Sequence, residues 1–376
     1  MTLIQMFILI AASLHLMVEI LLKYFDIRNT LKLRNEQPEE TVALMNHEQW
    51  IRTSDYTLAK TKLSILEDLF GFVLIVPIVL FLYPWTFRTW SASSQDGVFQ
   101  CAFISVAFLL SLQIPSLFLE WYKQFRLEDR FGFNKSTVKL WVSDKIKENT
   151  LGLIIGVLLF ALLIWLFRVL SDLSSYWWFF VFSAFFILQL SLMVLWPKFI
   201  LPLFNKLTPL GDGKLKSRLF ALADRTGFAA NTIEVIDGSK RSGHSNAFFT
   251  GFGKFRRIVL YDTLINQMEE DEIEAVLAHE IGHYKEAHIP KKLIFSFLTG
   301  LFAFYAISKS LQQDWLYEGL GLSENYVGSI SVILIALILF ISNFTYWFTP
   351  VSNIFSRKHE YEADRFAKKA MSNASS

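Results

Sequence analysis

The sequence predicts a mainly α-helical protein that crosses a lipid bilayer several times and carries one small α+β domain outside the bilayer. Of its 376 residues, 53% are hydrophobic and 16% are aromatic, and the mean hydropathy is +0.37. This composition is too apolar for a soluble domain. The net charge of +2 gives no reason to expect a nucleic-acid partner. Cys101 is the single cysteine, so no disulfide can form within the chain.

Seven apolar runs support the membrane prediction, because a helix needs about 20 apolar residues to cross the hydrocarbon core. The first run has no basic segment before it and no small-residue cleavage site after it. We therefore expect a retained helix there and not a cleaved signal peptide. The predicted spans are residues 3–22, 66–87, 98–120, 151–170, 177–201, 291–309 and 328–349.

Lysine and arginine alternate between dense and sparse from one connection to the next. They are dense at 23–63, at 121–149, in the long segment after the fifth span and in the C-terminal tail. The connections between these contain Arg88 alone, Arg168 alone and, at 310–327, neither residue type. Because positive charge collects on the cytoplasmic side of a membrane, we expect an outside N-terminus and a cytoplasmic C-terminus.

The one long polar segment follows the fifth span. Its periodicity and turn residues predict two helices and three short strands. The helices are expected at 214–226 and at 269–288, the second ended by Pro290, and the strands at 232–237, 245–251 and 256–262.

Four parts of the chain follow from these predictions. Residues 1–201 hold membrane helices one to five, with cytoplasmic loops 23–63 and 121–149. Residues 202–290 form a cytoplasmic domain, 291–349 hold the last two membrane helices, and 350–376 form a C-terminal helix.

The second helix of the polar domain contains His279-Glu280-Ile281-Gly282-His283, an HExxH motif. Histidines four residues apart lie on one helical face, so both imidazoles can reach the same metal ion. Glu280 lies near that ion and can act as a base toward a metal-bound water. The alternative, a charged surface turn with two solvated histidines, is disfavoured by the residues that follow in the sequence.

A zinc peptidase site needs a third protein ligand, and the best candidate is Glu360 in the segment after the seventh span. Glu360 and Asp364 are four residues apart and share a helical face. One carboxylate can bind the metal while the other supports a ligating imidazole. His359 and Glu362 remain rival ligands. By itself, this segment would more readily be an ordinary charged helix beside the membrane.

HExxH on a membrane-proximal helix, followed after one hydrophobic hairpin by SRxxExxAD at 356–364, resembles the type I CAAX prenyl endopeptidases. These are integral-membrane zinc metallopeptidases of the gluzincin group. Stretches at 128–135, 202–206, 237–247 and 257–264 are also similar to hallmarks of this family. The resemblance therefore covers nearly the whole chain.

The resemblance implies one Zn²⁺ per chain, with Glu360 as the third ligand, Glu280 as the base and Asp364 as the support of an imidazole. It also implies seven transmembrane helices that form a barrel around a large chamber, with a small α+β zinc-metallopeptidase domain on the cytoplasmic side. The short connection between Thr263 and His279 is similar to that of bacterial members of the family.

The family pattern extends past the end of this sequence. Members carry a further cytoplasmic segment with a His-Pro motif near the active site, whereas this sequence ends at Ser376. We therefore expect a chain of this length to lack one group that helps to hold the oxyanion, and its activity to be affected.

Five further residues are candidates for substrate binding. Asn246 and Ala247 are expected on an edge strand beside the metal, where an extended peptide can add through main-chain hydrogen bonds; a plain structural strand is the alternative. His244 is expected to contact the substrate and not the metal. Arg357, like Arg257, is a candidate partner for a site carboxylate or a substrate C-terminus, with solvated surface charge as the alternative.

The predicted function is hydrolysis of peptide bonds near the C-terminus of prenylated or other membrane-associated polypeptides by a Glu-activated, zinc-bound water. One alternative is a membrane quality-control protease without prenyl specificity. A zinc-dependent transporter and a catalytically silent scaffold are further alternatives. A transporter would be expected to have metal ligands in the middle of its spans, and a silent scaffold would not need HExxH together with Glu360.

We expect a monomer in the lipid bilayer, with no nucleic-acid partner. The membrane would be the bacterial inner membrane, or the endoplasmic reticulum membrane if the source is eukaryotic. The catalytic domain would face the cytoplasm.

Overall fold

The computed structural model describes residues 1–43, 45–90, 96–228, 231–250 and 256–372, and the chain divides into two compact units. The first unit comprises Met1–Asn134, Ile146–Ser175 and Ala306–Trp347. The second comprises Lys135–Lys145, Tyr176–Tyr305 and Phe348–Ser376.

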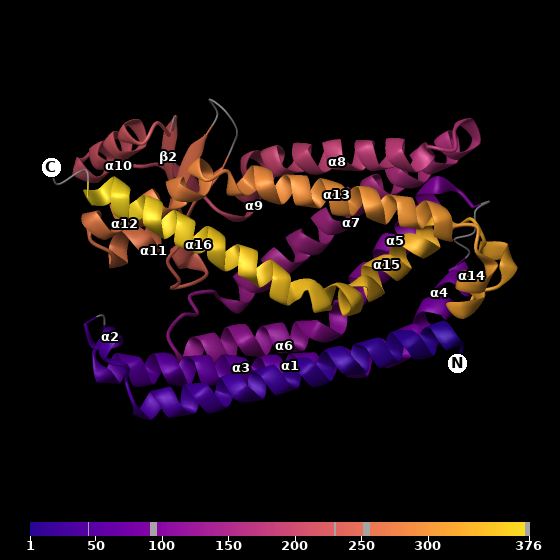
Figure 1. The fold of residues 1–376 in the computed structure, drawn as a ribbon, viewed down its shortest axis with the longest axis horizontal. Helices are drawn as coiled ribbons and strands as arrows, with labels where there is room; N and C mark the ends of the chain where they lie inside the picture. Colours follow the sequence, from indigo (N-terminus) through magenta and orange to yellow (C-terminus); the bar gives the residue numbers. More distant parts are fainter. Residues whose placement is uncertain (44, 91–95, 229–230, 251–255, 373–376) are drawn as a thin grey trace. The chain divides into compact units, whose positions relative to one another are not determined.

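Long helices make up most of the first unit. In this unit α1 and α3 lie side by side (Figure 1), and an ion pair between Arg34 and Asp55, with Nε and Oδ1 2.8 Å apart, joins them. The helices wholly or mainly in this unit are α1 (Leu3–Asn35), α2 (Glu39–Val42), α3 (His47–Pro77), α4 (Tyr83–Trp90), α5 (Val98–Ser111), α6 (Leu117–Tyr122), α7 (Val138–Leu173), α14 (Asp314–Gly319) and α15 (Ile330–Thr345).

The second unit combines helices with a small sheet. Its helices are α8 (Trp177–Leu195), α9 (Leu201–Phe204), α10 (Lys214–Arg225), α11 (Asp262–Gln267), α12 (Glu270–Lys285), α13 (His288–Ser310, to Tyr305 in this unit) and α16 (Thr349–Ser372). Its strands are β1 (Leu207–Pro209), β2 (Thr232–Ile236), β3 (Ala247–Thr250) and β4 (Arg257–Tyr261).

Seven helical stretches within the described residues are long and apolar enough to cross a membrane, which confirms the predicted number of spans. They are Leu3–Asn35, His47–Trp90, Val98–Glu128, Val138–Leu173, Trp177–Phe204, His288–Ser310 and Ile330–Ser372. The helical fold class predicted from the composition is therefore correct.

Several helices extend beyond the predicted spans. Because α1 continues to Asn35, α3 begins at His47 and α7 begins at Val138, the connections expected at 23–63 and 121–149 are largely helical. Hydropathy detects only the bilayer-length part of a helix. The helix itself continues as long as its backbone hydrogen bonds do.

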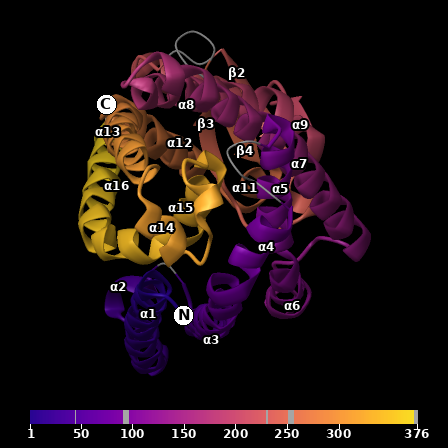
Figure 2. The ribbon, with the colours of Figure 1, turned by 90° about the vertical axis from the view of Figure 1, so that its right-hand side faces the viewer.

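The described strands form one sheet in the order β1-β2-β4-β3. Strand β2 runs parallel to β4. Strand β1 pairs antiparallel with β2, and β3 pairs antiparallel with β4. The strands expected at 232–237, 245–251 and 256–262 correspond to β2, β3 and β4, with Gly251 outside the described residues. Figure 2 shows β2, β3 and β4 together with α12, and α12 packs against β3.

Helices α10 and α12 enclose a hydrophobic core with the sheet. Leu219 and Leu222 of α10, Leu260 of β4, and Leu277 and Ile281 of α12 are each at most 1% exposed. The apolar residues of α12 recur every four positions, so one face of the helix enters this core. The histidines of the HExxH motif lie on the same helix and are fixed by that packing.

A buried carboxylate joins three helices of this unit. Glu274 on α12 is 5% exposed and accepts from Arg218 of α10, whose Nη2 lies 2.6 Å from Oε2. Arg225 of α10 bonds the other oxygen of Glu274 at 3.4 Å and the carbonyl of Ala370 on α16 at 3.3 Å. Since a buried charge needs partners, this cluster holds α10, α12 and α16 in register.

The HExxH helix begins with a reciprocal cap. The Glu269 side chain accepts from the N–H of Glu272, whose carboxylate accepts from the N–H of Glu269 at 2.9 Å. The prediction that Pro290 ends this helix is wrong. The helix ends at Lys285, because Ala287 has a φ of +54°, which a right-handed helix does not accommodate. Pro290 lies in the first turn of α13, where a missing N–H is tolerated.

Candidate metal centre

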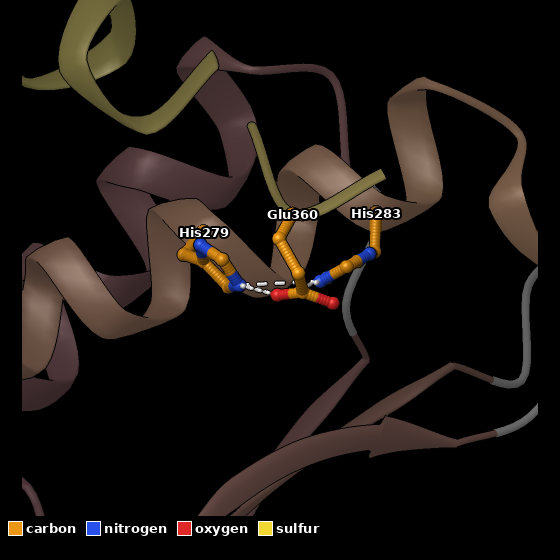
Figure 3. Close-up of side chains that lie close together, drawn as sticks. All are labelled: His279, His283 and Glu360. Atoms are coloured by element: carbon orange, nitrogen blue, oxygen red, sulfur yellow. Dashed lines mark hydrogen bonds and ion pairs between the residues drawn. The ribbon is translucent and has the colours of Figure 1, made fainter. Parts of the chain in front are cut away.

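Three side chains of the second unit converge at one point. The Nε2 atoms of His279 and His283 lie 3.1 Å apart, and Glu360 Oε2 lies 3.4 Å from the first and 3.6 Å from the second. Figure 3 shows the Glu360 carboxylate between the two imidazoles. The structure therefore brings together the three residues that the sequence proposed as metal ligands.

The convergence depends on a close crossing of α12 and α16. A Cβ on Gly282 would lie 2.9 Å from both the Cα and the carbonyl oxygen of Ala363, and Ala363 is fully buried. Only glycine allows two backbones to approach so closely. Since Gly282 lies inside the HExxH motif and Ala363 follows Glu360 by three residues, this contact brings the carboxylate to the histidines.

The donor atoms fit a tetrahedral zinc ion. Zinc binds imidazole nitrogen and carboxylate oxygen at about 2.0–2.1 Å, so two ligand atoms of a tetrahedron lie about 3.3 Å apart. The three observed separations, 3.1, 3.4 and 3.6 Å, bracket that value. Two nitrogens and one oxygen leave a fourth position, as in catalytic zinc sites.

The second nitrogen of each histidine also has a partner. Nδ1 of His279 lies 2.8 Å from Oδ1 of Asp364, the carboxylate expected to support an imidazole. Nδ1 of His283 lies 2.9 Å from Nδ1 of His288. The sequence interpretation missed His288, because it placed this residue at the end of a continuous helix. A third histidine five residues after HExxH was the available signal.

Glu280 lies beside the cluster on α12 and is partly buried. Burial raises the pKa of its carboxyl group; His279 acts in the opposite direction, and Glu360 adds to the rise. A raised pKa suits a residue that takes and returns a proton near neutral pH. Burial also lowers the pKa of His283, so the imidazole favours the neutral form that metal binding requires.

The rival ligands His359 and Glu362 belong to a different group. One possible ligand atom from each of them and one from His288 lie within 4.8 Å of one another. Glu362 Oε2 lies 2.9 Å from Nε2 of His288, which is 1% exposed.

The candidate substrate residues lie around β3. Ala247 begins this strand, and among the described strands β3 pairs with β4 alone, so it is an edge strand. Asn246 accepts from the N–H of Ala247 through Oδ1 at 2.9 Å. The carbonyl of His244 accepts from the hydroxyl of Thr263 at 2.9 Å, which fixes the loop before the strand. His244 is not part of the three-residue group that could hold a metal.

The two candidate arginines lie in different settings. Arg257 pairs with Glu234 of the neighbouring strand at 3.4 Å, which is not a carboxylate of the metal group. Arg357 is exposed on α16, and within the described residues it forms no ion pair.

A HExxH helix crossed by a carboxylate-bearing helix, in a protein whose described residues include seven membrane-length helices, defines a membrane-embedded metallopeptidase. Residues 26–206 match the family model described as "CAAX prenyl protease N-terminal, five membrane helices", and residues 209–376 match "Peptidase family M48". The chain belongs to the CAAX prenyl protease 1 family and is a metalloendopeptidase.

Relatives and a solved structure agree with this assignment. The chain is 36% identical to CAAX prenyl protease 1 of Saccharomyces cerevisiae over 354 residues, or 86% of this chain and 76% of that protein. It is 33% identical to the Dictyostelium discoideum homolog, over 96% of this chain and 86% of the homolog. The crystal structure of S. mikatae Ste24p matches with a TM-score of 0.85 and 33% identity, over 98% of this chain and 89% of that one.

These findings confirm the resemblance on which the sequence interpretation relied. They also confirm a multi-pass membrane protein that acts on a polypeptide substrate. The relatives named above are eukaryotic, and the expected similarity to bacterial members stays a prediction.

Proposed function

We propose that this protein is a zinc endopeptidase that cleaves prenylated, CAAX-type polypeptides near their C-terminus. One Zn²⁺ per chain is held by His279, His283 and Glu360. The observation that carries the proposal is the convergence of these donors within 3.1–3.6 Å, with Glu280 beside them. The similarity to CAAX prenyl protease 1 of Saccharomyces cerevisiae and to its Dictyostelium discoideum homolog supports the choice of a prenylated substrate.

The metal ion, Glu280 and Asp364 have different roles in peptide hydrolysis. When bound, zinc supplies a Lewis acid that polarises the scissile carbonyl and makes water a better nucleophile. Glu280 takes the proton of the attacking water and returns it to the leaving amine. Asp364 accepts from Nδ1 of His279, which leaves Nε2 of that imidazole free to bind the metal.

The edge of β3 supports a mode of substrate binding. An extended peptide adds to this edge through main-chain hydrogen bonds, and α12, which carries the metal-binding histidines, packs against β3. Asn246, next to Ala247, donates from Nδ2 to a substrate carbonyl while its Oδ1 is engaged with the backbone. His244 and Arg357 also contact the substrate, and the guanidinium of Arg357 pairs with a substrate carboxylate.

The charge pattern supports the placement in the cell. Lysine and arginine are dense on the connections that lie on the side of HExxH, so the metal site faces the cytoplasm. The protein acts as a monomer in the lipid bilayer. The eukaryotic relatives favour the endoplasmic reticulum membrane over a bacterial inner membrane.

The first test is the variant Glu280→Gln in purified full-length protein. It should still bind one zinc, because Glu280 is not a ligand, while cleavage of a farnesylated CAAX peptide should fall by about 10²–10⁴-fold. Glu286→Gln, which changes an exposed carboxylate just after the same helix, is the matched control and should keep full activity. Wild-type cleavage by Glu280→Gln would disprove the assignment of the base.

The second test addresses the substrate. Wild-type protein should cleave the farnesylated peptide with a higher kcat/KM than the unprenylated peptide of the same sequence. Equal rates on both peptides would contradict the prenyl specificity and leave the peptidase assignment intact.

A further inference from the structure

We propose that His288 and Glu362 are positioning residues that fix the orientation of the metal-binding His283. Together they form a carboxylate–histidine–histidine chain that ends at the metal. The inference deepens the proposed function and rests on it, because it assumes that His283 binds zinc through Nε2.

The chain of contacts is continuous and short. Nδ1 of His283 lies 2.9 Å from Nδ1 of His288, and Nε2 of His288 lies 2.9 Å from Oε2 of Glu362. His288 is 1% exposed, and both of its nitrogens are engaged in these two contacts. Buried polar atoms need such partners, so the geometry of His288 is set by its two neighbours.

The proton positions follow from the metal. If Nε2 of His283 binds zinc, the proton of that imidazole is on Nδ1 and is donated to Nδ1 of His288. The proton of His288 is then on Nε2, where Glu362 accepts it. Each ring nitrogen of His283 and His288 therefore acts only as a donor, as an acceptor or as the metal ligand. The carboxylate of Glu362, at the end of these contacts, increases the basicity of His283.

His279 is supported in a simpler way. Asp364 accepts directly from Nδ1 of His279 at 2.8 Å. Glu362 lies two residues before Asp364 on the same helix. It contacts His288, and His288 in turn contacts His283. Both ligating imidazoles are thus oriented by carboxylates of α16, one directly and one through an intermediate ring.

The backbone explains how His288 reaches this place. The positive φ of Ala287, +54°, separates α12 from α13, and His288 is the first residue of α13. His359 holds the ring from the other side, with centroids 4.0 Å apart and an interplanar angle of 22°.

A second metal site at His288, His359 and Glu362 is the competing interpretation, because their polar atoms lie close together. The stacked rings argue against it: the lone pairs of nearly parallel imidazoles run alongside each other and do not converge on one ion. A metal on Nε2 of His288 would also move the proton of that ring to Nδ1. Two N–H groups would then face each other between His288 and His283.

The experiment measures zinc affinity by competition with a chelator in purified full-length protein, together with the visible spectrum of the Co²⁺-substituted form. His288→Leu removes the acceptor for His283 and should weaken zinc binding by about 10–100-fold. His288→Asn places Oδ1 where Nδ1 lies and should recover most of the affinity. The control His359→Phe keeps the ring stack and should bind zinc like the wild type.

Glu362 gives an independent measurement if His288→Leu does not fold. Glu362→Leu should weaken zinc binding several-fold and change the Co²⁺ spectrum, while Glu362→Gln, whose amide oxygen still accepts from His288, should have a smaller effect. Wild-type affinity and spectrum in both His288→Leu and Glu362→Leu would overturn the inference.

Two further outcomes are distinguishable. Two zinc ions per wild-type chain, with one lost in His359→Phe, would overturn the inference in favour of a second metal site. No zinc on the wild-type protein at all would overturn the proposed function itself, before any variant is compared.

Discussion

The two histidines of HExxH depend on different neighbours even though they lie one helical turn apart. His279 contacts the exposed Asp364, while His283 contacts the buried His288. Helical periodicity predicts the common direction of the two imidazoles. It does not predict the groups behind them, because those come from α16 and α13.

The contact between Asp364 and His279 can be tested by substitution. Asp364→Ala removes the acceptor of the Nδ1 proton of His279 and should weaken zinc binding by about 10–100-fold. Asp364→Asn keeps an oxygen there and should lose less. Zinc competition on the purified variants measures both, with the exposed Lys368→Ala of the same helix as control. If Asp364→Ala bound zinc as tightly as the control, Asp364 would have no supporting role.

At the scale of elements, the site is a crossing of α12 and α16. Each helix could be predicted from its own sequence, but their close approach depends on Gly282 and Ala363. The close approach of the two helices explains why position 282, inside the HExxH motif, is a glycine. The Glu274 cluster further fixes α12 and α16 relative to α10.

Gly282→Ala tests this crossing. Alanine favours a helix by about 1 kcal/mol over glycine, but its Cβ would meet backbone atoms of Ala363 at 2.9 Å. Backbone overlap of this kind costs about 1–3 kcal/mol, so we expect a lower Tm and weaker zinc binding. Gly71→Ala, where a Cβ meets nothing within 4 Å, should be neutral or slightly stabilising. A Gly282→Ala protein as stable as Gly71→Ala would contradict this account.

Across the whole molecule, the candidate metal site brings together parts of one unit that are far apart in sequence. Helices α13, α14 and α15 lie between α12 and α16 in the chain. A ligand that binds only the folded state stabilises it by RT ln(1 + [L]/Kd). Zinc is therefore expected to hold α12 and α16 together as well as to serve catalysis.

Metal removal tests the stabilising role. Treatment with a strong chelator should abolish cleavage and lower the Tm, and added zinc should restore both. At free zinc about 1,000 times Kd, the stabilisation is about 4 kcal/mol. The variant His283→Ala provides the control, because its Tm should respond little to the chelator. Equal melting temperatures for zinc-loaded and chelated wild-type protein would show that the ion does not join the helices.

The membrane helices, the strands β2 to β4 and the paired histidines could be predicted from the amino-acid sequence, because they follow from local apolar runs and periodicity. The four-residue spacing of Glu360 and Asp364 proposed them as a ligand and its support, and the family resemblance then implied which carboxylate has which role. The barrel and its chamber stay predictions from that resemblance.

The roles of the acidic residues of α16, the end of α12 and the position of His288 depend on tertiary contacts. The tertiary structure separated the competing acidic residues of α16, so that Glu360 reaches the metal group while Glu362 contacts His288. It also ended α12 at Lys285 and brought His288 behind His283. The physical reason is that a metal site is defined by where side chains of separate helices meet, and that depends on a backbone crossing at Gly282 and a turn at Ala287.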